Sequence, residues 1–337
     1  MATQTAVPGR FATWAGILRT CGAPSIAELD RVGRILLITR ACVQPMTLTS
    51  AAVAGALAVR HPGFDWLLYL LASVGIVIAH AANNMINDYF DVRAGLDSDE
   101  YPRVQYAPHP VVAGVTDQSG LGRAILVANG LDGAIMVILL LARGWPVVAF
   151  ALAGLFISVF YVAPPLRLKA RGLGELSVFV IWGPLMVGGT YYSATGALPA
   201  DVIYASLPYA LLVTTVLLGK HIDKLSWDAS AGVTTLPVAL GEQRARRSTA
   251  ALIVAFYVTA SVLIVAGVVT PWIALIVLAL PTVRRVLRTY ARRPPDEPPA
   301  RYPLWPLWYG PWAFVHARRA GALLVAGFVL GAIWPIT

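Results

Sequence analysis

Long apolar runs, separated by short polar breaks, cover most of the chain. A helix that crosses a bilayer needs about 20 mainly apolar residues. On this criterion the pattern predicts nine helices, the eighth of them short, over residues 35–59, 64–86, 122–142, 146–163, 175–196, 202–219, 249–268, 270–283 and 319–336.

The connections between these runs are of two kinds, which alternate along the chain. Tight turns with few charges occur at residues 60–62, 143–146, 196–201 and 270–271. Longer connections hold nearly all of the charged residues and cover 87–121, 164–174, 220–248 and 284–318. The alternation places the four longer connections on one side of the membrane. Because Lys and Arg collect in cytoplasmic loops, we expect that side, and the N-terminus with it, to face the cytoplasm.

The composition supports a membrane protein rather than a soluble one. The chain is 58% hydrophobic and 13% charged, with a mean hydropathy of +0.68, whereas soluble domains carry about a quarter charged residues. Lipid must therefore be the solvent for much of the surface. The net charge of +9 lies mostly in the inter-helix loops, so it does not indicate a nucleic-acid partner. We predict an all-α integral membrane protein with membrane lipids around it.

The pattern indicates a single domain over residues 34–337, preceded by an N-terminal segment, 1–33. Trp14, Ile17 and Leu18 fit an amphipathic turn on the membrane surface, and a frayed tail is the alternative. The segment lacks the apolar core and cleavage site of a signal peptide. Cys21 and Cys42 match no metal-binding spacing and no disulfide framework, so we expect both to be bystanders.

A stripe of amides and carboxylates follows the second apolar run, in "NNMINDYFDVRAGLDSDE", residues 83–100. If the helix continues, Asn83, Asn87 and Asp91 lie on one face because they are four residues apart. Asn84 and Asp88 have the same spacing, shifted by one residue. Carboxylates at a helix end in lipid are costly unless something compensates them. Magnesium would do so, because it takes oxygen ligands and commonly shares carboxylates with a substrate phosphate.

A second acidic cluster ends the sixth run, in "GKHIDKLSWDASAGVTTLPVALG", residues 219–241, with Asp223 and Asp228. Both clusters follow even-numbered runs, so both emerge on the same side. Two such clusters could hold one diphosphate through bridging metal ions. The loop "FYVAPPLRLKARGLGE" adds candidate phosphate ligands, although the cations among them also fit the ordinary cytoplasmic bias: Tyr161, Arg167, Lys169 and Arg171.

Three motifs in this order resemble the UbiA superfamily of intramembrane prenyltransferases. The first is Asn-Asp-x-x-Asp with a later Asp, here Asn87 to Asp91 and Asp97. The second is the loop from Tyr161 to Glu175, and the third is the "GxxTLPVxLG" pattern from Gly232 to Gly241. The resemblance covers about residues 40–245. The "RGLGE" loop is most similar to members that prenylate 1,4-dihydroxy-2-naphthoate in menaquinone synthesis.

The resemblance implies a bundle of nine transmembrane helices around a central cavity open to lipid. It implies Mg²⁺-dependent transfer of a polyprenyl group from an allylic diphosphate to a hydrophobic aromatic acceptor, at the cytoplasmic side of the inner (plasma) membrane. The implied catalytic residues are Asn87, Asp88, Asp91, Asp97, Asp223 and Asp228, with Asn87, Asp91, Asp223 and Asp228 on the metal. The implied diphosphate-binding residues are Asn84, Tyr161, Arg167, Lys169, Arg171, His221 and Lys224.

The acidic pair at the end of the sixth run departs from the family pattern. Relatives usually space these acids four residues apart, but here Lys224 occupies that position and Asp223 is displaced by one. On a regular helix Asp223 and Asp228 would point about 140° apart. Either the helix is broken here, which would restore the pair, or Lys224 contacts the diphosphate as a point charge. We favour the second interpretation.

Three alternatives remain at this stage. The same ionisation could serve a UbiA-type terpene cyclase that uses no acceptor. It could also serve prenyl transfer to haem, chlorophyllide or a sugar phosphate. A membrane transporter is the alternative from another class, but its charged groups would lie near the bilayer midplane or in inverted repeats. Here the acids cluster at one face, which favours an enzyme.

Overall fold

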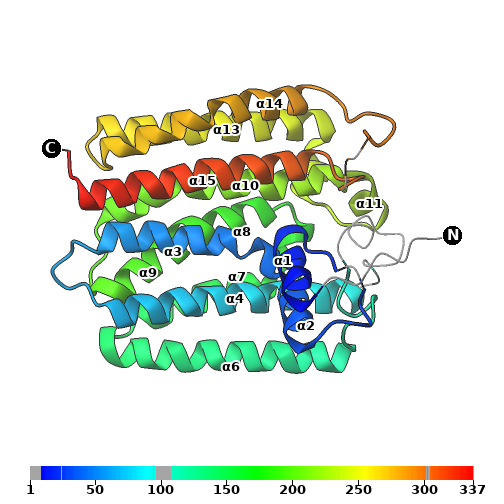
Figure 1. Cartoon of the computed structure of the whole chain (residues 1–337), viewed down its shortest axis with the longest axis horizontal. Helices are drawn as coiled ribbons and strands as arrows, with labels where there is room; N and C mark the ends of the chain where they lie inside the picture. The colour runs from blue at the N-terminus through cyan, green and yellow to red at the C-terminus, as the bar shows by residue number, and fades with distance from the viewer. Residues whose placement is uncertain are drawn as a thin grey trace.

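The computed structural model describes residues 9–23, 25–93, 95, 108–300, 302 and 304–336, and its regular elements in these ranges are helices. The bundle runs lengthwise in Figure 1. Its long elements are α3 (Pro45–Ala58), α4 (Trp66–Arg93), α6 (Gln118–Arg143), α7 (Pro146–Phe160), α10 (Ala200–Asp223), α13 (Glu242–Val265), α14 (Leu280–Ala291) and α15 (Tyr309–Ile333). The all-α prediction is therefore confirmed.

Several short elements connect or interrupt the long ones. At the N-terminus these are α1 (Arg10–Thr20), α2 (Arg31–Ile38) and the 3₁₀ turn η1 (Ala41–Val43). In the middle of the chain they are η2 (Leu168–Ala170), α8 (Gly174–Val180), the π-helical turn η3 (Ile181–Leu185), α9 (Met186–Thr195), α11 (Leu225–Ser230) and α12 (Leu236–Leu240). The 3₁₀ helix η4 (Pro271–Ala279) precedes α14.

Three of the predicted runs are not single regular helices. The first is broken between α2 and α3, where Arg40 has a left-handed φ of 51° and Pro45 begins α3. The fifth contains the π-turn η3 around Pro184, because proline removes a helical hydrogen bond. The eighth begins as the 3₁₀ helix η4. These breaks follow from local backbone chemistry that hydropathy alone does not register.

In the part of the chain that the structure describes, six segments are long and apolar enough to cross a membrane: those that contain α3, α4, α6, α10, α13 and α15. Side chains on the outer face of α6 are apolar and exposed, with Leu126 73% and Leu141 83% accessible. In water such a surface would be unfavourable, whereas lipid solvates it. The chain is therefore a multi-pass membrane protein, and the predicted number of nine crossings stays a prediction.

The core is centred on α10, which packs against α8, η3, α13 and α15. Tyr209 in the middle of α10 is 2% exposed, and its hydroxyl donates a 2.7 Å hydrogen bond to the carbonyl oxygen of Met46. A buried Tyr hydroxyl usually finds such a partner. This bond joins α10 to α3, so the two halves of the chain are packed as one body.

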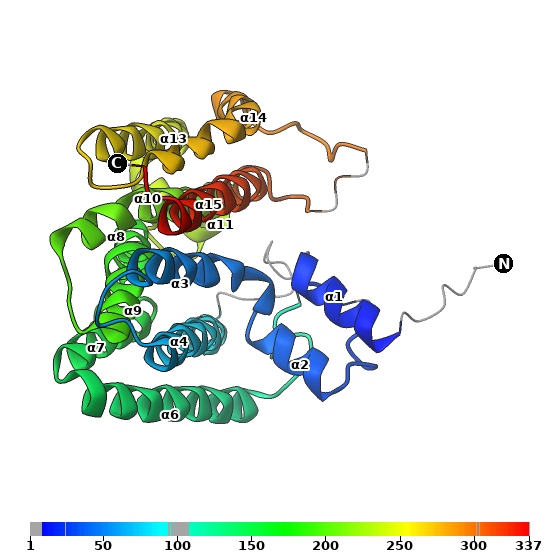
Figure 2. The same ribbon diagram turned by 60° about the vertical axis from the view of Figure 1, so that its left-hand side comes forward.

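The two N-terminal helices, α1 and α2, lie across one end of the bundle rather than along it (Figures 1 and 2). Ile17 of α1 is 1% exposed and packs in a small cluster with Leu29, Leu37 and Val115. Asp30 caps α2 by accepting from the backbone N–H of Gly33, and this bond lowers the pKa of Asp30 below its usual value. The segment is therefore packed on the bundle, and the frayed-tail interpretation is wrong for the described residues of α1.

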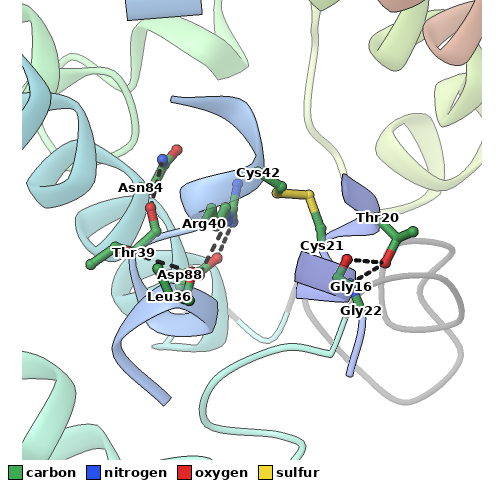
Figure 3. The surroundings of a disulfide bond; sticks show 10 residues. All are labelled: Gly16, Thr20, Cys21, Gly22, Leu36, Thr39, Arg40, Cys42, Asn84 and Asp88. Atoms are coloured by element: carbon green, nitrogen blue, oxygen red, sulfur yellow. Dashed lines mark hydrogen bonds and ion pairs between the residues drawn. A yellow bond between two sulfur atoms is a disulfide. The ribbon is translucent and has the colours of Figure 1, made fainter. Parts of the chain in front are cut away.

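Cys21 and Cys42 form a disulfide, which corrects the prediction that both are bystanders. Cys21 ends α1 and Cys42 lies in η1, and their Cα atoms are 5.3 Å apart. Spacing along the sequence did not reveal the pair, because only the fold of α1 back onto η1 brings the two residues together. Figure 3 shows the bond beside the residues that contact α4.

Candidate functional site

The polar end of α4 and the end of α10 meet at one cavity, of about 200 Å³. We call it the polar cavity. Its charged and amide wall consists of Arg40, Asn83, Asn84, Asn87, Asp91, Lys169, Lys220, His221 and Lys224. The cluster after the second predicted run and the cluster that ends the sixth therefore share one space. This arrangement agrees with the prediction that both clusters emerge on the same side of the membrane.

Asp91 is held by a cation from the loop that follows α7. The Nζ atom of Lys169 donates to both carboxylate oxygens of Asp91 at 2.9 Å. The side chains of Lys169 and Asp91 are 13% and 15% exposed. One turn earlier on α4, the buried Oδ1 atom of Asn87 has no hydrogen-bond partner among the described residues. A cavity wall with an unused amide oxygen beside a carboxylate suits an oxygen-coordinated cation.

Asp88 has a different role from its neighbours on α4. Its side chain is fully buried and forms an ion pair with Arg40, and Nε2 of His109 lies 3.6 Å from its Oδ1 atom. It is not among the residues that line the polar cavity. This ion pair attaches the turn between α2 and α3 to α4, as Figure 3 shows. Asp88 thus positions Arg40, which lines the cavity, without lining the cavity itself.

The acids at the end of α10 are separated by a break in the helix. α10 ends at Asp223, and Lys224 has a non-helical backbone before α11 begins. The break does not restore the acid pair, because Asp223 turns toward α15: its two oxygens accept from the backbone N–H groups of Tyr309 and Gly310 at 2.7 and 2.8 Å. Lys224 lines the polar cavity instead. Asp228 lies in α11 and is 5% exposed.

His221 lines the polar cavity and is positioned by a buried carboxylate. Its Nδ1 atom lies 2.8 Å from Oε1 of Glu175, and both side chains are buried. Glu175 belongs to the "RGLGE" loop, at the start of α8. The contact therefore ties the loop that carries Lys169 to the end of α10. Tyr161, 8% exposed, lines the same cavity.

The remaining loop cations lie farther out. Arg167 has a left-handed φ of 43° and lines a separate cavity of about 480 Å³ that it shares with Asp91, Lys169 and Gly232. Arg171 donates to the carbonyl oxygen of Pro165 at 3.2 Å and lines neither cavity. The structure thus brings Arg167 to the edge of the site and leaves Arg171 outside the two cavities.

Asn84 and Asp97 are the two remaining predicted site residues. Asn84 lines the polar cavity while its amide donates to the carbonyl oxygen of Thr39 at 3.2 Å. Asp97 lies outside the described residues. Sequence reasoning assigned no site role to Arg40 or Lys220, and it placed Glu175 in a motif without giving it a partner. An arginine inside a predicted apolar run was a signal for Arg40, because buried cations in lipid need a partner.

A second, mainly apolar cavity of about 150 Å³ adjoins the first between α4, α6, α7 and α9. We call it the apolar groove. It shares four lining residues with the polar cavity: His80, Asn83, Ile181 and Trp182. The rings of His80 and Trp182 meet edge to face at 5.0 Å. The groove continues to Phe150, Gly154 and Met186. A ligand with a charged head and a long apolar tail would match this combination.

Comparison with known proteins agrees with this geometry. The UbiA prenyltransferase family matches residues 48–308. The chain is 26% identical to a 1,4-dihydroxy-2-naphthoate octaprenyltransferase of Bacillus subtilis, over 75% of this chain and 81% of that protein. It is 32% identical to the protein of the same name from Mycobacterium tuberculosis, over 72% of this chain and 82% of that protein.

A solved structure has the same fold. It is a UbiA homolog from Archaeoglobus fulgidus bound to GPP and Mg²⁺, with a TM-score of 0.54 and 17% identity, over 86% of this chain and 99% of that one. At this identity the likeness shows the fold alone. The family match carries the assignment: the chain is a prenyltransferase and belongs to the UbiA prenyltransferase family.

Proposed function

We propose that the protein transfers a polyprenyl group from an allylic diphosphate to 1,4-dihydroxy-2-naphthoate or a closely similar aromatic acceptor. The observation that carries the proposal is the convergence of Asn87, Asp91 and Lys169 with Lys220 and Lys224 on one cavity beside an apolar groove. The names of the Bacillus and Mycobacterium relatives support the naphthoate acceptor.

The cations of the polar cavity would bind the diphosphate head. Lys220 and Lys224 come from the end of α10, and Lys169 comes from η2 in the loop after α7. A diphosphate in the cavity would be contacted by cations from both segments, as point charges suit phosphate oxygens. These contacts strengthen as negative charge develops on the leaving group, which is how electrostatic stabilisation lowers a barrier.

The oxygen atoms of Asn87 and Asp91 fit Mg²⁺, and the relative solved with GPP and Mg²⁺ supports that metal. Among the described residues, no group of three or more His, Cys, Asp or Glu side chains forms a metal site by itself. We therefore assign Asn87 and Asp91 to the metal, add Asp228 of α11 as a further ligand although it does not line the polar cavity, and leave Asp223 out. Bound Mg²⁺ would supply Lewis acidity toward the diphosphate oxygens.

The protein's own residues would then guide the reaction. The C1–O bond of the donor breaks as the diphosphate leaves, and an electron-rich carbon of the acceptor ring bonds to C1 and later loses its proton. Trp182 presents aromatic surface where the two cavities meet, and Tyr161 presents it in the polar cavity. Such surfaces stabilise cations. The apolar walls exclude water, which would otherwise capture the allylic cation.

The apolar groove would hold the prenyl tail, and Gly154 offers a test of this. A side chain at Gly154 would point into open space within the groove. We expect Gly154→Phe to reduce the transfer of long donors much more than that of short ones, because the added ring fills the space of the tail. The measurement is kcat/KM for donors of increasing length.

The matched control is Gly130→Phe on α6. That position also has open space around it but lies outside the groove. If Gly154→Phe lowered kcat/KM equally for all donor lengths, or if Gly130→Phe showed the same dependence on length, the prenyl tail would not bind in this groove.

The proposal includes an orientation. The polar cavity lies at the end of the bundle that carries the basic loops, so it would open to the cytoplasm, with the protein in the inner (plasma) membrane. Segment 1–33 would lie at the same surface, and residues 34–337 would form a single domain with nine crossings. Accessibility labelling of engineered cysteines in spheroplasts would measure this orientation.

The function is tested by incubating purified protein with labelled prenyl diphosphates and a panel of acceptors, then identifying products by mass. We expect a prenylated naphthoate-derived product and released diphosphate, stopped by chelation and restored by Mg²⁺. Cyclic hydrocarbon formed without acceptor would identify a terpene cyclase instead. If products formed only with haem, chlorophyllide or a sugar phosphate, that compound would be the acceptor in place of the naphthoate.

Asp223 and Asp228 are expected to differ when each is changed to Ala. Asp223 accepts from the first backbone N–H groups of α15, and loss of a helix cap costs about 0.5–2 kcal/mol. Asp223→Ala should therefore lower the melting temperature and leave the Mg²⁺ concentration for half-maximal activity unchanged. Asp228→Ala should raise that concentration. Titration of activity with Mg²⁺ checks both, and a raised requirement in the Asp223 variant would return that residue to the metal site.

A further inference from the structure

The two cysteines of the chain both line its polar cavity. The sequence contains no other cysteine, and both Cys21 and Cys42 line the cavity together with Asn87 and Lys220. Their Cα separation of 5.3 Å is within the usual span of a disulfide. A ring bound in this cavity would therefore share it with the sulfur atoms.

The side of the membrane argues against a purely structural bond. In the proposed orientation this end of the bundle faces the cytoplasm, where most disulfides are transient, catalytic or redox-sensing. The surrounding fold does not depend on the bond alone. α1 is also held by Ile17 in its apolar cluster and by the indole of Trp14, which donates to Asp30 at 3.0 Å. The helix would thus remain near the cavity when the thiols are reduced.

The disulfide is connected to α4 through a turn that makes two contacts with that helix. Cys42 lies two residues after Arg40, which pairs with Asp88, and the carbonyl oxygen of Thr39 accepts from Asn84. Figure 3 shows the disulfide on one side of this turn and the α4 contacts on the other. Cys21 and Arg40 both have left-handed φ angles, 62° and 51°, which are unusual outside glycine and concentrate at functional sites.

We propose that Cys21 and Cys42 form a redox site that is oxidised by a quinone bound in the polar cavity. The inference rests on the proposed function, because prenylation of a dihydroxynaphthoate leads to a quinol and quinone. One thiolate adds to the quinone ring, and the other attacks that sulfur to form the S–S bond. The two thiols lose two electrons and two protons, and the quinone gains them and leaves as the quinol.

Oxidation would also affect prenyl transfer. The disulfide fastens α1 to the turn that carries Arg40, at the wall of the polar cavity. In the reduced form α1 is held at that wall only by its apolar cluster and the Trp14–Asp30 hydrogen bond, so the wall can move more readily while substrates enter and products leave. An accumulated oxidised product would therefore slow further synthesis.

The test uses the full chain in lipid nanodiscs, reduced, freed of reductant and kept anaerobic. The probe is 2,3-dimethyl-1,4-naphthoquinone, whose substituted ring does not retain a thiol adduct. We expect the wild type to lose both maleimide-reactive thiols and to form one quinol for each disulfide. Cys21→Ser and Cys42→Ser each leave one thiol and should keep it while forming no quinol.

Wild-type thiols that survive excess quinone, or single variants that form quinol at the wild-type rate, would overturn the redox site. Thiol counting and quinol absorbance do not require prenyl transfer, so they decide this inference even if the acceptor assignment fails. In the transfer assay, we expect quinone pretreatment to slow the wild type and not the Cys21→Ser/Cys42→Ser variant. Equal slowing of both would show inhibition that does not involve the disulfide.

Discussion

Asp91→Ala is expected to lower kcat for prenyl transfer by about 10²–10³-fold, the usual cost of removing one preorganised electrostatic group. The substitution removes a metal-binding carboxylate and leaves Lys169, whose Nζ is 2.9 Å from both Asp91 oxygens, without its anchor. Asp91→Asn should also fail, because it keeps the shape of the side chain but not its charge. The measurement is single-turnover product formation at saturating donor and Mg²⁺.

The matched control is Asp201→Ala, an exposed acid in the first turn of α10 at the opposite end of the bundle. It should retain wild-type kcat, which separates loss of the site from general loss of charge. Near-normal turnover in both Asp91 variants would remove that residue from the site and would leave the diphosphate to the lysines alone.

Arg40→Met is expected to destabilise the protein by about 3–5 kcal/mol, the range for removing one partner of a buried ion pair. Asp88 is fully buried, so the substitution leaves a buried carboxylate without the guanidinium group that pairs with it. The turn between α2 and α3 would lose its attachment to α4. The measurement is the midpoint of thermal unfolding in detergent, followed by an intrinsic fluorescence signal.

The double variant Arg40→Met/Asp88→Asn is the decisive control. Removing both charges avoids the stranded carboxylate, so the double variant should be more stable than Arg40→Met alone. The amide introduced on α4 keeps hydrogen-bonding atoms for the surroundings. If the double variant were the less stable of the two, the pair would not be acting through buried charge.

Local patterns in the sequence predicted a large part of the site. The spacing of Asn87 and Asp91 depends only on helical periodicity, and α4 does continue through both residues. The loop cations were harder to rank, because cytoplasmic bias and phosphate binding produce the same residues. Lys169 lines the polar cavity, whereas Arg171 bonds to a nearby carbonyl and lies outside it.

Asp223 shows where a local argument stops. Its offset from Asp228 predicted either a broken helix or a compensating Lys224, and the structure has both features. The direction of its carboxylate depends on the N-terminus of α15, far along the chain, which offers it two backbone N–H groups. No reading of residues 219–241 alone contains that information.

The sequence by itself determined the membrane class, the helical content, the polar side and the amide–carboxylate stripe on α4, because apolar length and periodicity act within one helix. Only the tertiary structure decided the Arg40–Asp88 ion pair, the Glu175–His221 contact, the Cys21–Cys42 bond and the turning away of Asp223. Each of these joins segments that are distant along the chain. Such contacts depend on how helices pack and where their ends meet, which local hydropathy does not encode.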